Sequence, residues 1–319
     1  MNGESAFIHA LRAIATDPAA RRLADDAAVL QIGGEALVLT MDTVVEGIHY
    51  LPDDPPGDVA WKLVAVNVSD LSAKGAVPVG CLYSHALGDT AWDTAFLAGL
   101  DEACRRFAIS LLGGDTVRMP RDAPRSFSLT ALGTGTRGSP VPSRTAVQPG
   151  DRVWVSGTIG DAGLGLKAAL GELHGDPSAV AALLARYRRP APEPRLGAAL
   201  APLVHAMMDV SDGLLVDAAR MAEASATAIT LDVGSVPLSS AFVSMAGEAV
   251  ETRLTAMAAG DDYELLFTAP PRHTNAICRA AGALGLQVTA IGAVASGAGL
   301  SLLQDGIPMP LPEKLGYQH

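Results

Sequence analysis

The chain has 319 residues, enough for a large core and long for a single domain, so two domains are expected. Lys and Arg total 23 against 34 Asp and Glu, a net charge of -11, and aromatic residues make up 4%; both values argue against a nucleic-acid-binding surface. Three cysteines without CxxC spacing, no leader-like N-terminus and no apolar run of transmembrane length are typical of a cytoplasmic protein that does not enter a membrane.

Periodicity and turn residues in the first half predict helices over 5–16, 58–73 and 93–107, and strands at 38–40, 80–87, 109–112 and 126–136. The first of these strands runs into Asp42 and Thr43, a carboxylate beside a hydroxyl, which are ligands that Mg²⁺ prefers. In the helix 58–73, Asn67, Asp70 and Lys74 share one face. An exposed polar face is one interpretation, but the surrounding segment is apolar, and buried polar groups would need partners.

The strand at 109–112 ends in Gly113-Gly114-Asp115-Thr116, where the glycines allow a ligand to approach the backbone closely. A stretch with three prolines, 138–150, is the best candidate for a domain boundary. The second half then predicts strands at 153–156, 206–210 and 287–292, another within 255–268, and helices over about 161–170, 178–188, 196–205, 214–225 and 274–284.

Several common motifs can be excluded. Residues 133–138 fit GxGxxG, but Ser139-Pro140 follows where a dinucleotide site needs a helix. The sequence has no P-loop, HExxH or GxSxG motif. The glycine-rich turn at 157–165 opens a helix and could hold phosphate, but without a lysine in the loop a structural turn is the better interpretation.

Aspartates recur at the ends of apolar runs, often beside Gly or Ser: Asp25, Asp26, Asp42, Asp70, Asp115, Asp209 and Asp212. Together with Arg144 in the boundary segment, they suggest several divalent ions around a polyphosphate. Phosphoryl transfer depends on positioning and charge neutralisation, which such residues supply without a covalent nucleophile.

Motifs in order along the whole chain resemble the thiamine-monophosphate kinase family, within the aminoimidazole-ribonucleotide synthetase superfamily. They are the segments 25–28 (DDAA), 41–49 (MDTVVEGIH), 65–76 (AVNVSDLSAKGA), 113–116 (GGDT), 155–162 (VSGTIGDA), 209–214 (DVSDGL), 260–267 (GDDYELLF) and 316–317 (GY). Each motif is weak alone, and their combination is specific.

The resemblance implies a two-domain α/β (α+β) fold. An N-terminal domain, 1–138, would bind ATP and Mg²⁺ and pair its sheet with that of a second copy in a homodimer. A C-terminal α/β domain, 139–319, would complete the cleft. The implied reaction transfers a phosphoryl group from ATP to thiamine monophosphate in one direct in-line step, assisted by several Mg²⁺ ions.

The resemblance also implies roles for individual residues. Metal-binding positions are Asp26, Thr40, Met41, Asp42, Asp70, Asp115, Asp209 and Asp212, among which Asp42, Asp70 and Asp212 are assigned to catalysis. Nucleotide-binding positions are Gly114, Asp115, Arg144 and Ser211. Positions for the acceptor substrate are His49, Asp261 and Tyr317.

Three positions depart from the family pattern. Met41 replaces Ser or Thr, so only its carbonyl could bind a metal; Asp261 replaces Glu; and Ala24 replaces Gly. The alternatives are another ATP-dependent phosphotransferase or synthetase of the superfamily, or a nucleotide-binding module without activity. The first Cys, Cys81, lies too far along for a selenophosphate synthetase, and the tail lacks the cysteine of the hydrogenase-maturation relative. Intact aspartates argue against an idle site, because they would carry uncompensated charge.

Overall fold

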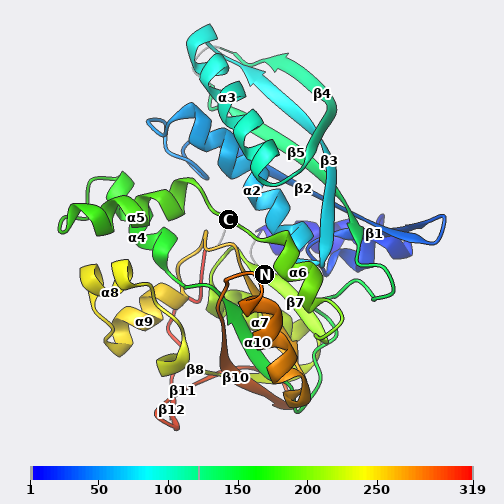
Figure 1. Ribbon diagram of the computed structural model, residues 1–319, viewed down its shortest axis with the longest axis vertical. Helices are drawn as coiled ribbons and strands as arrows, with labels where there is room; N and C mark the ends of the chain where they lie inside the picture. The colour runs from blue at the N-terminus through cyan, green and yellow to red at the C-terminus, as the bar shows by residue number, and fades with distance from the viewer. Residues whose placement is uncertain (1–2, 121–122, 318–319) are drawn as a thin grey trace.

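The computed structural model describes residues 3–120 and 123–317, and it builds two halves, each on one β-sheet (Figure 1). The α/β class and the two-domain organisation that the sequence predicts are confirmed. Residues 136–151 lie between the last strand of the first sheet and the first strand of the second, without helix or strand. The predicted boundary at 138/139 falls in this segment, and its position stays a prediction.

The N-terminal half has a five-stranded sheet in the order β1-β2-β5-β3-β4, in which only the β3–β4 pair is parallel. Its elements are α1 (Gly3–Leu11), a 3-10 segment η1 (Pro18–Leu23), β1 (Ala28–Ile32), β2 (Glu35–Val45), α2 (Pro56–Ala73), β3 (Ala76–Leu87), α3 (Thr90–Arg106), β4 (Ser110–Arg118) and β5 (Ser126–Gly135). α2 and α3 cover one face of this sheet (Figure 1).

The C-terminal half has a seven-stranded sheet in the order β12-β11-β8-β10-β6-β9-β7. Its strands are β6 (Arg152–Ser156), β7 (Ala206–Val210), β8 (Thr227–Asp232), β9 (Glu264–Ala269), β10 (Val288–Ser296), β11 (Gly299–Gln304) and β12 (Ile307–Met309). Its helices are α4 (Asp161–Ala169), α5 (Pro177–Arg188), α6 (Pro194–Leu200), α7 (Leu214–Ala224), α8 (Ser240–Ala246), α9 (Val250–Met257) and α10 (Thr274–Gly282), with short 3-10 turns η2 (Val233–Ser235) and η3 (Pro271–His273).

Helix α2 connects the two halves. Its residues are buried nearly all the way round, as expected for a helix packed on every side. Leu63 and Leu71 belong to the N-terminal core, whereas Ala73 packs in a cluster of the C-terminal half. Lys74 caps the helix and Gly75 follows with φ +58°, the left-handed conformation that favours glycine after a helix. The predicted limits of this helix are therefore confirmed within two residues.

The two faces of the N-terminal sheet differ sharply. Along β2, Thr40 and Val44 are buried beneath α2, while the alternate residue Met41 is 62% exposed. In the register of the sheet, Met41 is followed across the open face by Thr130 and Leu82. This open face carries exposed large apolar residues: Met41, Val77, Val79, Leu82, Leu112 and Val117.

Three predicted elements are wrong at their ends. The helix expected over 5–16 ends at Leu11, because the apolar residues Phe7 and Ile14 are exposed and have no surface to pack on. The helix expected over 196–205 ends at Leu200, before Pro202. Strand β4 continues through Gly113-Gly114-Asp115, where a loop was expected, because these residues pair with β3. In the described chain no helix is long and apolar enough to cross a membrane.

Candidate active site

A cavity of about 620 Å³ lies between the two halves and gathers most of the predicted site residues. Its walls come from β2 and the turn after it, α2, α4, α5, the β7–α7 junction, residues 259–263 and the C-terminal Tyr317. The predicted residues that line it are Asp42, His49, Asp70, Asp209, Ser211, Asp212, Asp261 and Tyr317. The fold thus brings together segments from both halves of the chain.

Strand β2 and helix α2 form the acidic wall of the cavity. Thr40 Oγ1 donates to a carboxylate oxygen of Asp70 and lies 3.3 Å from the carbonyl oxygen of Asp26. The Asp42 backbone N–H donates to Asn67 Oδ1 at 3.0 Å, and Asn67 Nδ2 donates to the carbonyl of Leu63. The polar residues of α2 are therefore buried with partners in the site, and the exposed-face interpretation is wrong.

The β7–α7 junction supplies the opposite wall. Ser69 of α2 donates to Asp209 Oδ2 at 2.7 Å, which ties the two halves together. The backbone N–H groups of Ser211 and Asp212 both donate to Asp217 Oδ2 at 3.1 Å. Asp217 is fully buried and lies in the first turn of α7. It was not singled out from the sequence, although acidic residues are typical of the first turn of a helix.

Three carboxylates in this region have raised pKa values. Burial, followed by the charges of Asp26 and Asp212, raises the pKa of Asp42 to about 6. Burial and neighbouring carboxylates also raise the pKa of Asp70 and of Asp209 well above the ordinary value. Like charges held close together in a low-dielectric site disfavour ionisation, and a divalent cation among them would reverse that effect.

The neighbouring pair Asp25 and Asp26 is neutralised by basic side chains. Lys74, fully buried, contacts Asp25 and lies 2.8 Å from Asp26 Oδ2 and 3.0 Å from the carbonyl oxygen of Met207. Arg144 contacts Asp26 through its guanidinium. Burial opposes ionisation of Asp25, but the charges of Lys74 and Arg21 outweigh it and lower its pKa to about 2.

A polar cluster at the other end of the cavity surrounds Asp261. Lys62 Nζ lies 2.7 Å from Asp261 Oδ2, donates to the carbonyl of His49 at 3.0 Å, and stands 4.3 Å above the ring of Tyr187. Tyr263 Oη donates to Asp261 Oδ1 at 3.0 Å. Lys62 and Tyr187 were not predicted as site residues. For Lys62 the sequence offers one signal, a lysine within an apolar helical segment, and the structure shows this lysine to be buried.

The backbone around this cluster is fixed from both sides. Asp261 adopts φ +70°, an unusual conformation for a non-glycine residue that recurs at functional sites, and its N–H donates to the carbonyl of Ser211. The N–H of Tyr317 donates to the carbonyl of Asp212 at 2.8 Å. A Cβ at Gly316 would stand 2.5 Å from that same carbonyl oxygen, so the preceding position has room only for glycine.

Gly114 and Asp115 lie outside the cavity, on the edge strand β4. Asp115 pairs with Ser84, on the open face of the sheet and opposite to the face that carries Asp42. A Cβ at Gly114 would stand 1.8 Å from the carbonyl oxygen of Tyr83, so strand packing explains this glycine. Met41 also faces outward. Within one chain these three residues are not part of the site.

The glycine-rich turn before α4 is structural, as the sequence favoured. The N–H of Gly160 donates to both carboxylate oxygens of Asp262, at 3.0 and 2.9 Å. A carboxylate of this chain thus occupies the helix N-terminus where phosphate would bind. The turn contributes to the site through Ala162 and Gly163, which line the cavity.

Across residues 3–120 and 123–317, no three His, Cys, Asp or Glu side chains are arranged to hold a metal ion as they stand. Two observations nevertheless fit a cation at this place. The donors are carboxylate and hydroxyl oxygens, which suit Mg²⁺, and three of the carboxylates have pKa values raised by burial and by neighbouring carboxylates. The metal-binding roles remain predictions.

Comparisons with known proteins agree along nearly the whole chain. The family model for AIR synthase related protein, N-terminal domain, matches residues 24–135, and that for the C-terminal domain matches residues 148–304. A thiamine-monophosphate kinase of Caulobacter vibrioides is 41% identical over 95% of this chain and 86% of its own length.

Two solved structures extend the comparison. Thiamine-monophosphate kinase from Stenotrophomonas maltophilia K279a is 38% identical, covers 95% of each chain and superposes with a TM-score of 0.79. AaThiL complexed with AMPPCP and TMP is 29% identical, covers 99% of this chain and 97% of its own, and has a TM-score of 0.84. By sequence and by structure, the chain belongs to the thiamine-monophosphate kinase family of AIR synthase related proteins.

Proposed function

We propose that this protein transfers the γ-phosphoryl group of ATP to thiamine monophosphate, giving thiamine diphosphate and ADP. Membership of the family supports the reaction, and a relative that binds AMPPCP, an ATP analogue, together with TMP supports the pair of substrates. The observation that carries the proposal is one cavity with an acidic wall at Asp42, Asp70 and Asp209 and a separate polar cluster at Asp261.

The acidic wall is the proposed metal and nucleotide region. Asp42, Asp70, Asp209 and Asp212 would hold Mg²⁺, together with Asp26 and Thr40. When bound, Mg²⁺ would neutralise the phosphates that must approach each other despite their like charges. Thr40 and Ser69 orient the carboxylates of Asp70 and Asp209 through their hydroxyl groups. Arg144 holds Asp26 in place and offers a guanidinium beside it for a nucleotide phosphate.

The cluster around Asp261 is the proposed acceptor region. Thiamine carries a positively charged thiazolium ring, so a carboxylate at one end of the cavity is complementary to it. Lys62 and Tyr263 fix the two oxygens of Asp261, and the ring of Tyr317 lines the same space. The acceptor is a phosphate oxygen, already anionic at neutral pH, so the reaction needs alignment of the substrates more than a strong general base.

A homodimer belongs to the proposal as well. The open face of the N-terminal sheet displays six large apolar residues in a chain that is otherwise strongly acidic, and exposed apolar surface of this kind marks interaction sites. Asp115 lies on the same face. If a second copy packs on this face, Gly114 and Asp115 come close to the site of that copy. They would then take part in nucleotide and metal binding there. We also propose a cytoplasmic location, where ATP is available as the co-substrate.

The test is a coupled assay of ADP release with ATP and Mg²⁺, offering thiamine monophosphate, thiamine and an aminoimidazole-ribonucleotide precursor in parallel. We expect ADP release, with thiamine diphosphate formed, only with thiamine monophosphate. Selenophosphate formation is measured separately with selenide. Turnover only with another acceptor would overturn the assigned substrate and move the protein to a sister activity of the same fold.

A further inference from the structure

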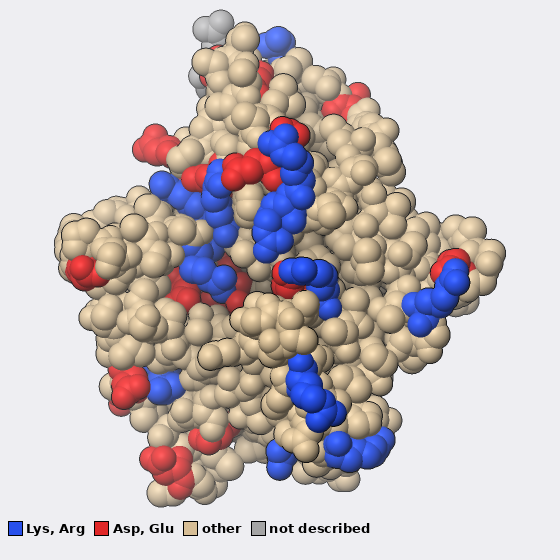
Figure 2. Space-filling model, in the orientation of Figure 1, with Lys and Arg blue, Asp and Glu red and all other residues tan. Residues whose placement is uncertain are grey.

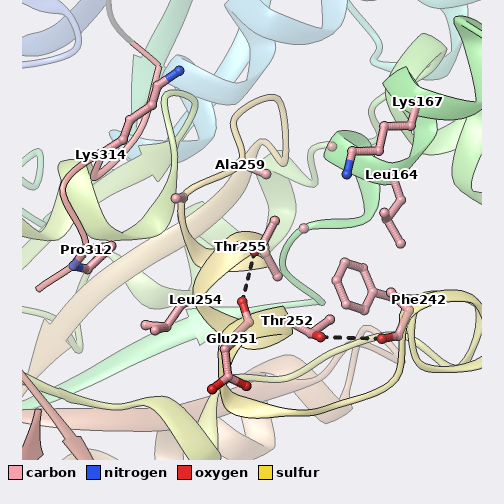
Figure 3. Close-up of a pocket in the computed structure, with 15 residues that line it drawn as sticks. Leu164, Lys167, Phe242, Glu251, Thr252, Leu254, Thr255, Ala259, Pro312 and Lys314 are labelled. Atoms are coloured by element: carbon pink, nitrogen blue, oxygen red, sulfur yellow. Dashed lines mark hydrogen bonds between the residues drawn. The ribbon is translucent and has the colours of Figure 1, made fainter. Parts of the chain in front are cut away.

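A second cavity, of about 770 Å³, is larger than the one at the candidate site (Figure 3). Its walls come from α4, α8, α9 and the C-terminal segment around Pro312. Only Gly163 and Ala259 line both cavities. A volume of this size falls within the range of small-molecule binding sites, roughly 300–1,000 Å³. The two cavities are neighbours with different walls.

The floor of this second cavity is apolar. Phe242 and Leu164, both less than a tenth exposed, lie side by side on one side of it, and Leu254 and Pro312 lie on the other (Figure 3). Apolar side chains on both sides of the space suit a flat ring, which can pack between them and exclude water. The floor therefore favours a ligand with a planar apolar part.

The upper edge of the cavity in Figure 3 carries two amines. Lys167 extends from α4 with its amine toward the cavity, whereas the side chain of Lys314, on the C-terminal segment, points upward and away from Phe242 (Figure 3). In the described chain, neither amine lies within ion-pairing distance of a carboxylate. The carboxylate of Glu251 lies at the opposite, lower end of the view (Figure 3). The cavity is thus basic at one end and apolar below it.

The use of lysine in this chain sets these two residues apart. Lysine occurs at only four positions, and arginine supplies every other basic side chain apart from histidine. Lys62 and Lys74 are buried at the candidate active site, where they hold carboxylates. Lys167 and Lys314, the remaining two, both line the second cavity. An accidental surface distribution would not place both on one cavity in so acidic a protein.

We propose that this cavity is a second binding site, separate from the site of phosphoryl transfer, for a small molecule that joins a planar apolar ring to a phosphate group. The ring would pack between the apolar walls, and the phosphate would meet the amine of Lys167, toward which the exposed side chain of Lys314 would turn, since charge-assisted hydrogen bonds to phosphate are among the stronger polar contacts. The inference does not depend on the proposed reaction, because of the residues that line this cavity only Gly163 and Ala259 also line the candidate site.

The test is calorimetric titration of the intact protein with 1-naphthyl phosphate, beside its neutral counterpart 1-naphthol. We expect saturable binding of the phosphate at one site per chain and weaker binding of the naphthol. Lys167→Gln with Lys314→Gln should weaken binding of the phosphate at least about tenfold. Thr255→Trp, at an exposed position on the cavity wall, should fill the space and weaken both compounds.

The matched control is Arg272→Gln with Arg279→Gln, which removes the same charge at exposed positions outside the cavity. It should leave binding within twofold. If both double variants weakened the binding of 1-naphthyl phosphate equally, the effect would come from the overall charge of the protein. That result would overturn the proposal. The proposal would also be overturned if thiamine monophosphate displaced naphthyl phosphate competitively while the lysine substitutions had no effect on binding. That result would assign the binding to the first cavity. Absence of saturable binding would also overturn the proposal.

Discussion

Two groups of buried carboxylates meet beside α2, and they differ in what neutralises them. Asp25, Asp26 and Asp212 are paired with Lys74, Arg144 and Arg220. Asp42, Asp70 and Asp209 have no ion pair with a basic side chain in the described part of the chain; their side chains or backbone contact Asn67, Thr40 and Ser69, which are neutral. We call these the paired and the unpaired group.

The pKa directions follow this difference. Basic neighbours lower the pKa of Asp25 to about 2 although burial opposes them, whereas burial and neighbouring charges raise the pKa of Asp42 to about 6. Within the paired group, Asp25 is therefore neutralised by the chain itself and serves as a frame, while Asp26 and Asp212 combine their ion pairs with a place in the proposed metal site. The unpaired group lacks such compensation, which fits the proposed Mg²⁺ site. On the face of the molecule in Figure 2, several acidic and basic side chains lie next to one another, among a larger area of other residues.

The largest effect is expected for Asp70→Asn in the unpaired group. Losing a ligand charge should lower kcat by about 10²–10³-fold, while removal of a carboxylate that repels Asp42 and Asp209 should leave the free energy of unfolding unchanged or raise it. Steady-state assays with excess Mg²⁺ and chemical denaturation measure the two quantities. Asp53→Asn, at an exposed position, is the control. Near-normal turnover would remove Asp70 from the catalytic assignment.

Lys74→Met tests the paired group. Removing this buried amine leaves Asp25 and Asp26 with less compensation, and breaking a buried pair costs about 3–5 kcal/mol. The free energy of unfolding from urea titration should fall by that amount. Lys314→Met, at an exposed lysine, should change it by less than about 0.5 kcal/mol. Equal stabilities for the two variants would show that the paired group is not a frame.

The stability of the metal-free protein should depend on pH, because the folded state raises the pKa of carboxylates in the unpaired group. Asp42 has a folded pKa of about 6 against 3.8 for an ordinary aspartate, so between these pH values the folded state binds more protons than the unfolded state. Stability should therefore fall as pH rises through this window, by on the order of 3 kcal/mol. Asp217, with a pKa raised to about 7 mainly by burial, acts in the same direction.

Thermal unfolding in chelator, from pH 4.5 to pH 7.5, measures this slope, and repeating the series with Mg²⁺ should restore stability mainly at the upper end. A metal-free protein that became steadily more stable over the same range, with no gain from Mg²⁺, would contradict the proposed cation site.

The comparison also shows what the sequence could predict. It located the acidic residues of both groups and the helix α2, because a polar residue inside an apolar helical segment is visible without a structure. It could not separate paired from unpaired carboxylates, since Lys74 and Asp25 are far apart in sequence and Arg220 was not considered. Nor did it show that Asp115 lies on the opposite face from Asp42, because it ended the strand before Gly113. Residues 227–257, with β8, α8 and α9, carried no motif and were left unassigned.

Asp261 is intermediate between the two groups and should give the smallest effect. Its carboxylate has one basic partner, Lys62, and is a third exposed, so it can exchange part of that contact for a cationic ligand. Asp261→Ala should raise the KM for thiamine monophosphate roughly tenfold, the loss of one charged contact, and the KM for ATP less than twofold. Asp261→Glu keeps the charge and restores the residue usual in the family, so it should retain acceptor binding. A larger change in the KM for ATP than for the acceptor would instead place Asp261 with the nucleotide.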